Sequence, residues 1–234
     1  MKKYFFTLSA FVVGLTANSM AQNPMPAPVQ KKSILLMNGT AHLGNGQVIQ
    51  NSAIGIKDGK LTLVADATVI RLQAGAFDTT INIAGKQVYP GFIAPNSTLG
   101  LNEIEAVRST RDFSETGNYN PHVRSIISYN SDSKIPPTVR TNGVLVAQIT
   151  PRNGIISGTS SVIELDGWNW EDMTMKADDG IHLNWLRMFK RDFSGYEEGA
   201  PFPPLKKNED YEKQKAELKT FFNDSKAYSE STPS

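Results

Sequence analysis

Between residues 33 and 88 the chain is a series of short apolar runs separated by turn dipeptides. The clearest case is Asp58-Gly59, which stands between the apolar runs 54–56 and 61–64. Because Asp-Gly favours the tight turns that join two antiparallel strands, these runs are predicted to form a hairpin. Two further dipeptides predict turns in the same way, Asn38-Gly39 and Asn45-Gly46. This region is therefore expected to be a small antiparallel β domain.

A different pattern begins at Pro90, where the apolar runs become longer and lose their alternation. Residues 88–93 and 143–150 are such runs, and continuous apolar segments are typical of strands buried on both faces of a parallel sheet. The polar stretch between them contains Pro136-Pro137, which is expected to open a short helix. A strand, a helical connection and a second strand make one β/α unit. The pattern thus predicts the opening of a (β/α) barrel.

The last part of the chain is predicted to end in a helix. A Gly/Ser-rich loop over residues 154–161 leads to a strand at 162–165, and an aromatic-rich insertion follows from 167 to about 204. Asn208 is expected to cap the helix, and the acidic residues after it suit the positive first turn. One face of this helix is then formed by Tyr211, Lys215, Leu218, Phe221 and Phe222.

Composition removes several classes of function. The chain has 24 basic and 23 acidic residues among 234, so no strongly basic surface for nucleic acid is expected. It has no cysteine, which excludes disulfides, thiolate metal sites and a cysteine nucleophile. Small molecules and other proteins remain as partners.

The N-terminus has the three-part pattern of a secretory signal peptide, which we predict over residues 1–21. Lys2 and Lys3 supply the charge, an apolar stretch follows over 4–17, and small residues precede a cleavage point. The apolar stretch is short for a membrane span, and the alternative is a buried N-terminal helix. Residues 22–32 are rich in proline and are expected to form an unstructured linker. The protein is therefore expected to be periplasmic or secreted, with no membrane association after cleavage.

Three polar residues follow the first apolar run of the predicted barrel: Asn96, Ser97 and Thr98. Since the carboxyl ends of barrel strands carry catalytic groups, these residues are expected to line a pocket. The alternative is that they only cap the strand. Arg152 follows the second run, where its guanidinium and the loop amides could hold an anionic group of a substrate. The alternative for Arg152 is an ordinary surface turn.

The run Gly-Lys-x-Val-x-Pro-Gly-Phe-Ile ending at Ile93 resembles the first barrel strand of the imidazolonepropionase-like amidohydrolases. In that superfamily the run continues Asp-x-His-x-His, and the two histidines bind the catalytic metal. Here Ala94 stands in the place of the aspartate, and Asn96 and Thr98 stand in the places of the histidines. The resemblance covers about residues 33–165. It implies that the metal motif of the family is replaced in this chain.

The resemblance also implies a fold, because family members have a metal-bearing TIM barrel beside a composite β-sandwich. Residues 33–88 would belong to the sandwich. Residues 89–234 would be the opening (β/α) units of an incomplete TIM barrel, with an insertion and a C-terminal helix. A TIM barrel takes roughly 250 residues, whereas about 145 follow Pro90. The chain is therefore expected to be the N-terminal part of a longer protein or a truncated gene product.

The chemistry implied by the resemblance is hydrolysis of C–N bonds in small amide or peptide-like substrates, with zinc or another divalent metal as cofactor. One hypothesis is that the chain belongs to an active hydrolase whose metal is held by residues outside it. A second is a non-catalytic homologue that binds a ligand, or that pairs with an active paralogue or a second copy. A third is a secreted β binding module formed by the segment before Pro90 alone.

Other candidate groups have less specific spacing. The three histidines are far apart and lack metal-ligand spacing: His42, His122 and His182. Residues 178–182 imitate a metal loop, but the preferred interpretation is a solvated turn that leads to a helix. Four carboxylates after the first barrel strand either take part in acid/base chemistry or are solvated: Glu103, Glu105, Asp112 and Glu115. Four aromatic residues of the insertion form either a local core or a pocket wall: Trp168, Trp170, Trp185 and Phe189.

Overall fold

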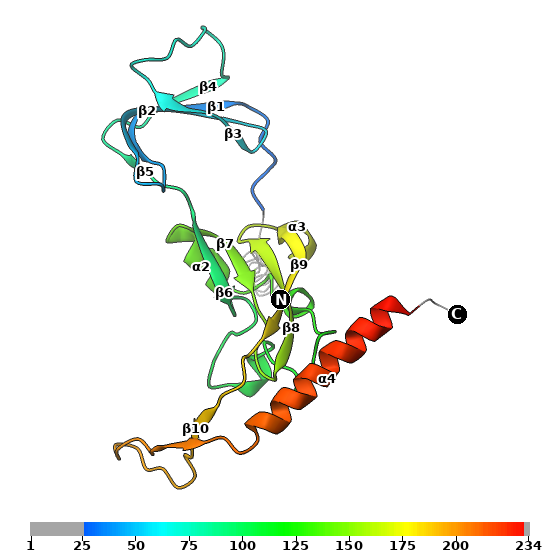
Figure 1. The fold of residues 1–234 in the computed structure, drawn as a ribbon. Helices are drawn as coiled ribbons and strands as arrows, with labels where there is room; N and C mark the ends of the chain where they lie inside the picture. Colours follow the sequence, from blue (N-terminus) through cyan, green and yellow to red (C-terminus); the bar gives the residue numbers. More distant parts are fainter. Residues whose placement is uncertain (1–25, 232–234) are drawn as a thin grey trace, which may run out of the picture.

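The computed structural model describes residues 26–231, which form a mixed α/β structure with several sheets and few helices (Figure 1). The predicted signal peptide and the first residues of the predicted linker lie outside the described residues. Within residues 26–231, no helix is both long and apolar enough to cross a membrane. The first sheet lies at one end of the molecule, and the second lies between it and the C-terminal elements (Figure 1).

The first sheet has five strands, of which three form an antiparallel meander in the order β3-β2-β1. The remaining two pair with β1 in the parallel direction, so the prediction of a purely antiparallel domain is wrong. Both parallel strands are short, with four and two residues. The strands are β1 (Ile34–His42), β2 (Val48–Lys57), β3 (Lys60–Asp66), β4 (Thr79–Asn82) and β5 (Gln87–Val88).

Of two dipeptides that were predicted to form turns in this sheet, one forms a turn and the other does not. Asp58 and Gly59 join β2 to β3 with φ of 51° and 70°, the left-handed backbone that a tight hairpin needs. The predicted hairpin is confirmed. Asn38 also has a positive φ, 71°, but it lies inside β1 at a register shift between Met37 and Gly39. The same dipeptide chemistry produces a β-bulge there instead of a turn.

The second sheet has the order β6-β7-β8-β9 and carries the main core. β6 and β7 are parallel and are joined by a long loop and the helix α2, so the predicted β/α unit is present. Pro136 lies in the first turn of α2, as predicted. The elements are β6 (Phe92–Ser97), α2 (Ile135–Thr141), β7 (Val144–Ile149), β8 (Ile156–Glu164) and β9 (Thr174–Leu183). The core below this sheet consists of Leu101, Ile126, Tyr129, Ala147, Ile149, Ile163, Leu165 and Met173.

Three predictions for this sheet need correction. The described residues contain one β/α unit rather than several, because β8 runs antiparallel to β7 and β9 runs antiparallel to β8. The predicted Gly/Ser-rich loop at 154–161 largely belongs to β8, whose residues 156–161 are all buried. Small side chains fit a closely packed strand, and this overrides their preference for turns. The predicted solvated turn at 178–182 lies within β9.

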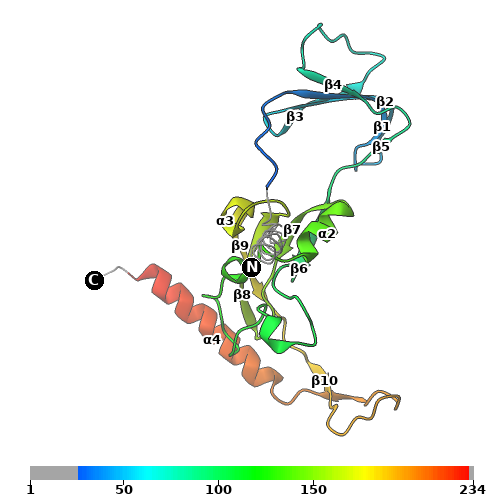
Figure 2. The ribbon, with the colours of Figure 1, turned by 180° about the vertical axis from the view of Figure 1, so that it is seen from behind.

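The C-terminal elements extend away from the sheets (Figures 1 and 2). A hairpin of β10 (Phe189–Arg191) and β11 (Leu205–Lys207) precedes the helix α4 (Tyr211–Glu230). The predicted helix is confirmed, and it packs through Leu218 and Phe221 against a second core cluster that includes Ile156. The prediction that Asn208 caps it is wrong, because the N-cap residue is Asp210, which makes no side-chain cap bond. Asn208 instead orders the segment before the helix: its side-chain oxygen accepts from Asp210 N at 3.3 Å, and its side-chain nitrogen donates to Arg187 O at 2.9 Å.

The aromatic residues of the predicted insertion do not form one cluster. Trp170, in the short helix α3 (Trp170–Met173), packs against the main core. Trp168, Trp185 and Phe189 are exposed. The insertion therefore does not form the local core that was one of the two interpretations.

Candidate functional site

Asn96 and Arg152, the two candidates from different predicted strand ends, are in contact. One guanidinium nitrogen of Arg152 donates to Asn96 Oδ1 at 2.6 Å, and the other terminal nitrogen donates to the backbone oxygen of Asn96. Asn96 has φ of 51°, a left-handed conformation that asparagine tolerates better than most residues. The two groups form a clamp, here called the Arg152–Asn96 clamp.

The elements around the clamp place its two residues side by side. Ser97 at the end of β6 accepts a hydrogen bond from Thr150 N at 2.8 Å through its backbone oxygen. This bond extends the parallel pairing of β6 and β7 to the point where both strands end. Asn153 and Gly154 then turn the chain with φ of 76° and 71°, and Arg152 N donates to Phe113 O at 2.5 Å. The loop after β7 is thereby held over the end of β6.

A row of polar contacts continues from the clamp across the sheet. Gln148 in β7 accepts from Asn96 N at 3.1 Å through its side-chain oxygen, and its side-chain nitrogen donates to Asp179 Oδ2 at 2.7 Å. Asp179 in β9 also receives Lys176 Nζ at 2.8 Å. The network thus connects β6, β7 and β9 through residues that are far apart in sequence.

The charges in this row are set by their neighbours. Hydrogen bonds from Lys176 and then from Gln148 lower the pKa of Asp179 from its ordinary value, so this carboxylate is ionised at neutral pH. Partial burial, and then the nearby charge of Arg152, lower the pKa of His182, while Asp179 opposes this shift. His182 is therefore neutral at pH 7, next to a fixed cation and a fixed anion.

Asn96 and Thr98, the residues that the resemblance aligned with metal-binding histidines, do not fit a divalent metal. The Asn96 oxygen already accepts from a guanidinium, whose positive charge would repel a second cation at that place. Catalytic zinc is held by histidine nitrogen or carboxylate oxygen rather than by neutral amide and hydroxyl groups. Among residues 26–231 there is no group of three or more His, Asp and Glu side chains arranged to hold a metal ion.

Ser97 and Thr98 have local roles in the structure. Ser97 Oγ accepts from Leu99 N at 3.1 Å, and the backbone oxygen of Thr98 accepts from Leu101 N at 2.9 Å. Both contacts shape the turn that follows β6. This arrangement matches the alternative in which these residues terminate the strand.

The loop carboxylates do not come together as an acid/base pair through any described contact. Glu103 accepts from Asn130 Nδ2 at 3.1 Å and from Ser133 Oγ at 2.9 Å, which ties the long loop to itself. Glu115 accepts from the backbone and hydroxyl of Thr116, and these bonds lower its pKa. Glu105 and Asp112 are exposed.

Of the polar row, Gln148 is absent from the sequence-based candidates, and Asp179 was considered only as part of the segment 178–182, with a solvated turn as the preferred interpretation. Gln148 was detectable in principle, since it is the one amide in the apolar run of β7. The position of Asp179 beside Gln148 was not detectable, because it depends on the antiparallel pairing of β9 with β8.

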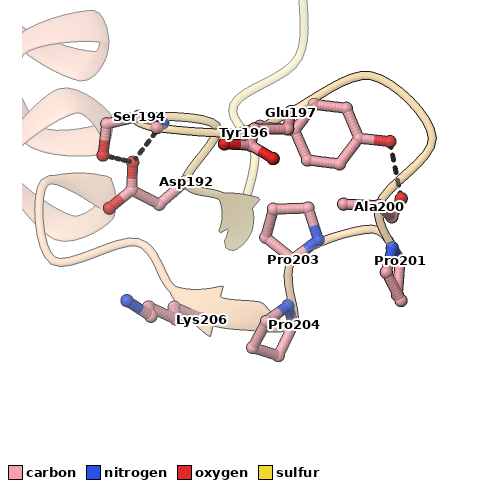
Figure 3. Close-up of a pocket in the computed structure, with 10 residues that line it drawn as sticks. Asp192, Ser194, Tyr196, Glu197, Ala200, Pro201, Pro203, Pro204 and Lys206 are labelled. Atoms are coloured by element: carbon pink, nitrogen blue, oxygen red, sulfur yellow. Dashed lines mark hydrogen bonds between the residues drawn. The ribbon is translucent and has the colours of Figure 1, made fainter.

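Five cavities in the described part of the chain are lined by residues other than Asn96 and Arg152. One of about 480 Å³ lies within the loop between β10 and β11 (Figure 3). Its walls are shaped by local bonds, with Tyr196 OH donating to Ala200 O at 2.8 Å and Ser194 Oγ donating to Asp192 Oδ1 at 2.6 Å. The clamp instead lies at the open surface of the second sheet.

Comparison with solved structures identifies a similar fold. The chain is similar to an amidohydrolase from Thermotoga maritima MSB8, with a TM-score of 0.55 and 24% sequence identity. The match covers 64% of this chain and 38% of that one, so this chain spans well under half of the other's length. No protein-family model and no curated protein sequence matches the chain. The matched part therefore has an amidohydrolase-like fold.

Proposed function

We propose that this chain is a non-catalytic, ligand-binding part of an imidazolonepropionase-like amidohydrolase. In this proposal the ligand is a small amide or peptide-like molecule that carries a carboxylate. The observation that carries the proposal is the Arg152–Asn96 clamp, which puts a permanent cation where the family's metal motif would begin. The similar fold of a Thermotoga amidohydrolase supports the family-level part.

Arg152 is suited to a carboxylate because its guanidinium presents five N–H donors in a planar fork. Two hydrogen bonds to Asn96 hold that fork in a fixed orientation, which reduces the ordering that ligand binding would require. Gln148 lies next to the clamp and carries both a donor and an acceptor, the pair that an amide group needs. Neutral His182 adds no competing charge.

The alternative is an active hydrolase that cleaves C–N bonds with a metal held by residues other than Asn96 and Thr98. The amidohydrolase-like fold is the observation that favours it. The two proposals differ in one measurable property, since only the hydrolase releases product from a bound amide when a divalent metal is supplied.

Binding and turnover should be measured on the same purified protein with N-acetylglycine as the probe. Calorimetric titration is expected to give binding, and incubation with added zinc is expected to release no glycine. Arg152→Gln should weaken binding by roughly 10- to 100-fold, the loss expected for a charge-assisted hydrogen bond. Arg152→Lys should also weaken it, because an ammonium lacks the planar fork.

Arg71→Gln is the matched control, because Arg71 is an exposed arginine outside the second sheet. This variant should bind N-acetylglycine like the unmodified chain. Zinc-dependent release of glycine would replace the proposal with the hydrolase alternative. Absence of binding, or equal binding by Arg152→Gln, would refute the role of Arg152.

For localisation we propose export to the periplasm or secretion after removal of residues 1–21. The support is the pattern of charged, apolar and small residues at the N-terminus. N-terminal sequencing of the protein recovered from the periplasm or medium should begin at Gln22. Recovery of the chain from the cytoplasm with Met1 intact would contradict this.

A further inference from the structure

Asparagine is followed by glycine at four places in the chain: Asn38, Asn45, Asn142 and Asn153. Asparagine is thermally labile, and a glycine after it lets the next backbone nitrogen reach the side-chain amide because no Cβ stands in the way. Such an attack requires the nitrogen and the amide carbon to approach each other closely. The structure around each pair therefore decides which of the four reacts.

Hydrogen bonds hold the pair at the end of α2. Gly143 N donates to Arg140 O at 2.9 Å, and Asn142 Nδ2 donates to Thr138 O at 3.0 Å. Both reacting groups are thus bound to carbonyl groups of the helix. An attack would have to break these bonds first, which slows the reaction at Asn142.

Sheet pairing holds the pair inside β1. This strand has partners on both sides, and Asn38 Nδ2 donates to Asn82 Oδ1 at 3.0 Å. Gly39 is buried, and a Cβ on it would lie 2.5 Å from Ile83 Cδ1. The backbone at Asn38 therefore cannot rotate without disturbing the sheet.

Loop packing holds the pair that follows Arg152. Asn153 Nδ2 donates to Glu115 O at 3.3 Å, and Gly154 O accepts from Asn184 Nδ2 at 2.9 Å. A Cβ on Gly154 would lie 2.9 Å from Gly117 O, so the glycine rests against the backbone of another loop. This pair is restrained from two sides.

The pair Asn45-Gly46 has no comparable restraint. Both residues are exposed in the loop 43–47 between β1 and β2. A Cβ on Gly46 would meet no atom within 4 Å, and the Gly46 N–H donates no hydrogen bond within residues 26–231. The Asn45 side chain bonds only to its neighbour Gln47, accepting from Gln47 N at 3.0 Å and donating to Gln47 Oε1 at 3.4 Å.

We infer that Asn45 is the site at which this chain deamidates spontaneously, and that the fold protects the other three pairs. The deprotonated nitrogen of Gly46 attacks Asn45 Cγ and closes a cyclic imide. The Cγ–Nδ2 bond breaks, and ammonia leaves with the proton that the Gly46 nitrogen gave up. Water then opens the imide at either carbonyl, which gives aspartate or isoaspartate. Both products carry a carboxylate that is ionised at neutral pH.

The new charge would lie beside the connection between the two sheets. A Cβ on Gly44 would lie 3.4 Å from Pro90 Cγ, so the loop 43–47 touches the segment that leads from β5 to β6. His42, just before this loop, stacks on Tyr89 with 4.3 Å between ring centroids. An isoaspartate also lengthens the backbone of the loop by a methylene group. The inference does not depend on ligand binding by Arg152.

Peptide mapping by mass spectrometry tests this on the unmodified chain. The folded chain, and the same chain unfolded in guanidinium chloride, are incubated in mildly alkaline water enriched in the heavy oxygen isotope, and are then digested in ordinary water. Only deamidation before digestion incorporates the label. Fragmentation of the tryptic peptide 33–57 separates Asn38 from Asn45. In the folded chain Asn45 should react several-fold faster than the other three asparagines, and in the unfolded chain the four rates should converge.

Three outcomes would overturn the inference. One is that another Asn-Gly pair reacts first in the folded chain, and a second is that all four react there at equal rates. The third is that the unfolded chain keeps the rate ratios of the folded one, because the flanking sequence rather than the fold would then set them.

A substitution links the charge change to Asn45. Asn45→Gln keeps an amide but requires a larger ring for the attack, so the first acidic band that forms on isoelectric focusing should be missing from this variant. Asn142→Gln is the matched control at another exposed Asn-Gly pair, and it should form this band at the unmodified rate. Thermal unfolding verifies that both variants fold. An acidic band that forms equally fast in Asn45→Gln would contradict the assignment.

Discussion

The two ends of strand β6 are built in opposite ways. At its start, Phe92 and Ile93 expose apolar side chains and the strand edge is open within the described residues. At its end, Asn96 is held on three sides by polar groups, with Arg152 on its two oxygens and Gln148 on its backbone N–H. Both ends rest on the same parallel pairing with β7.

The difference shows where each end obtains its stabilisation. The polar end finds its partners within the chain, at sequence separations of 52 and 56 residues. The apolar end finds no such partners among residues 26–231. The following predictions test this contrast, beginning with the core that supports both ends.

Truncating a core side chain under the β6–β7 pair should have the largest effect on the free energy of unfolding. Ile149 in β7 is fully buried in the main core, so Ile149→Ala should lower the free energy of unfolding by about 2–5 kcal/mol. Urea denaturation followed by circular dichroism measures this change. Ile181→Ala is the control, because Ile181 in β9 of the same sheet is exposed and its truncation should leave the midpoint nearly unchanged. Equal effects would mean that the core does not lie where described.

Replacing Asn96 should separate its backbone role from its side-chain role. Asn96→Ala loses the oxygen that accepts from Arg152 and places alanine at φ of 51°, so a loss of about 2 kcal/mol is expected. Asn96→Gly loses the same oxygen but adopts this backbone without strain, so it should be less destabilised. Thermal unfolding of the two variants compares them directly. A glycine variant that is less stable than the alanine variant would contradict a left-handed Asn96.

Breaking the clamp from its other side should have a smaller effect. Arg152→Gln removes hydrogen bonds at an exposed position, so we expect a loss of about 1 kcal/mol or less. The same denaturation assay should show no change for Arg71→Gln. A loss of several kcal/mol in Arg152→Gln would indicate that the clamp supports the sheet itself rather than its surface.

The pH dependence should be the mildest effect, and both titrating groups act in the same direction. The pKa of His182 lies below its ordinary 6.5, so the unfolded chain binds this proton first and stability falls as the pH drops below about 6.5. The pKa of Asp179 lies below 3.8, so its contribution is present above that value and is lost as the pH falls through the lowered pKa. Melting temperatures measured from neutral to acidic pH should decline in both windows. His182→Gln should remove the upper decline only.

Local sequence chemistry accounts for a large part of the fold. Asp58-Gly59 forms the hairpin turn, Pro136 opens α2, and Leu218 and Phe221 bury part of the predicted face of α4, whereas Phe222 of that face is exposed. For the hairpin turn and the start of α2 the deciding interactions lie within a few residues, whereas the apolar face of α4 packs on a cluster that includes Ile156. Asn38-Gly39 shows the limit, since the pairing of β1 with β2 converts a predicted turn into a bulge.

The sequence predicted the two residues of the clamp, but it did not predict that they contact each other. Asn96 and Arg152 were both expected at strand ends, and the parallel pairing of β6 and β7 brings these ends together. Asp179 and His182 were assigned to a turn, and their place in the polar row follows only from the antiparallel return of β9.

The sequence by itself determined the short-range features of this protein: its hairpin turn, its β/α unit and its last helix. Backbone preferences and apolar periodicity act over a few residues, so they can be read along the chain. The tertiary structure decided the antiparallel direction of β8 and β9, the clamp between Asn96 and Arg152, and the exposure of Phe92 and Ile93. These depend on groups that are distant in sequence, and only packing determines which of them meet.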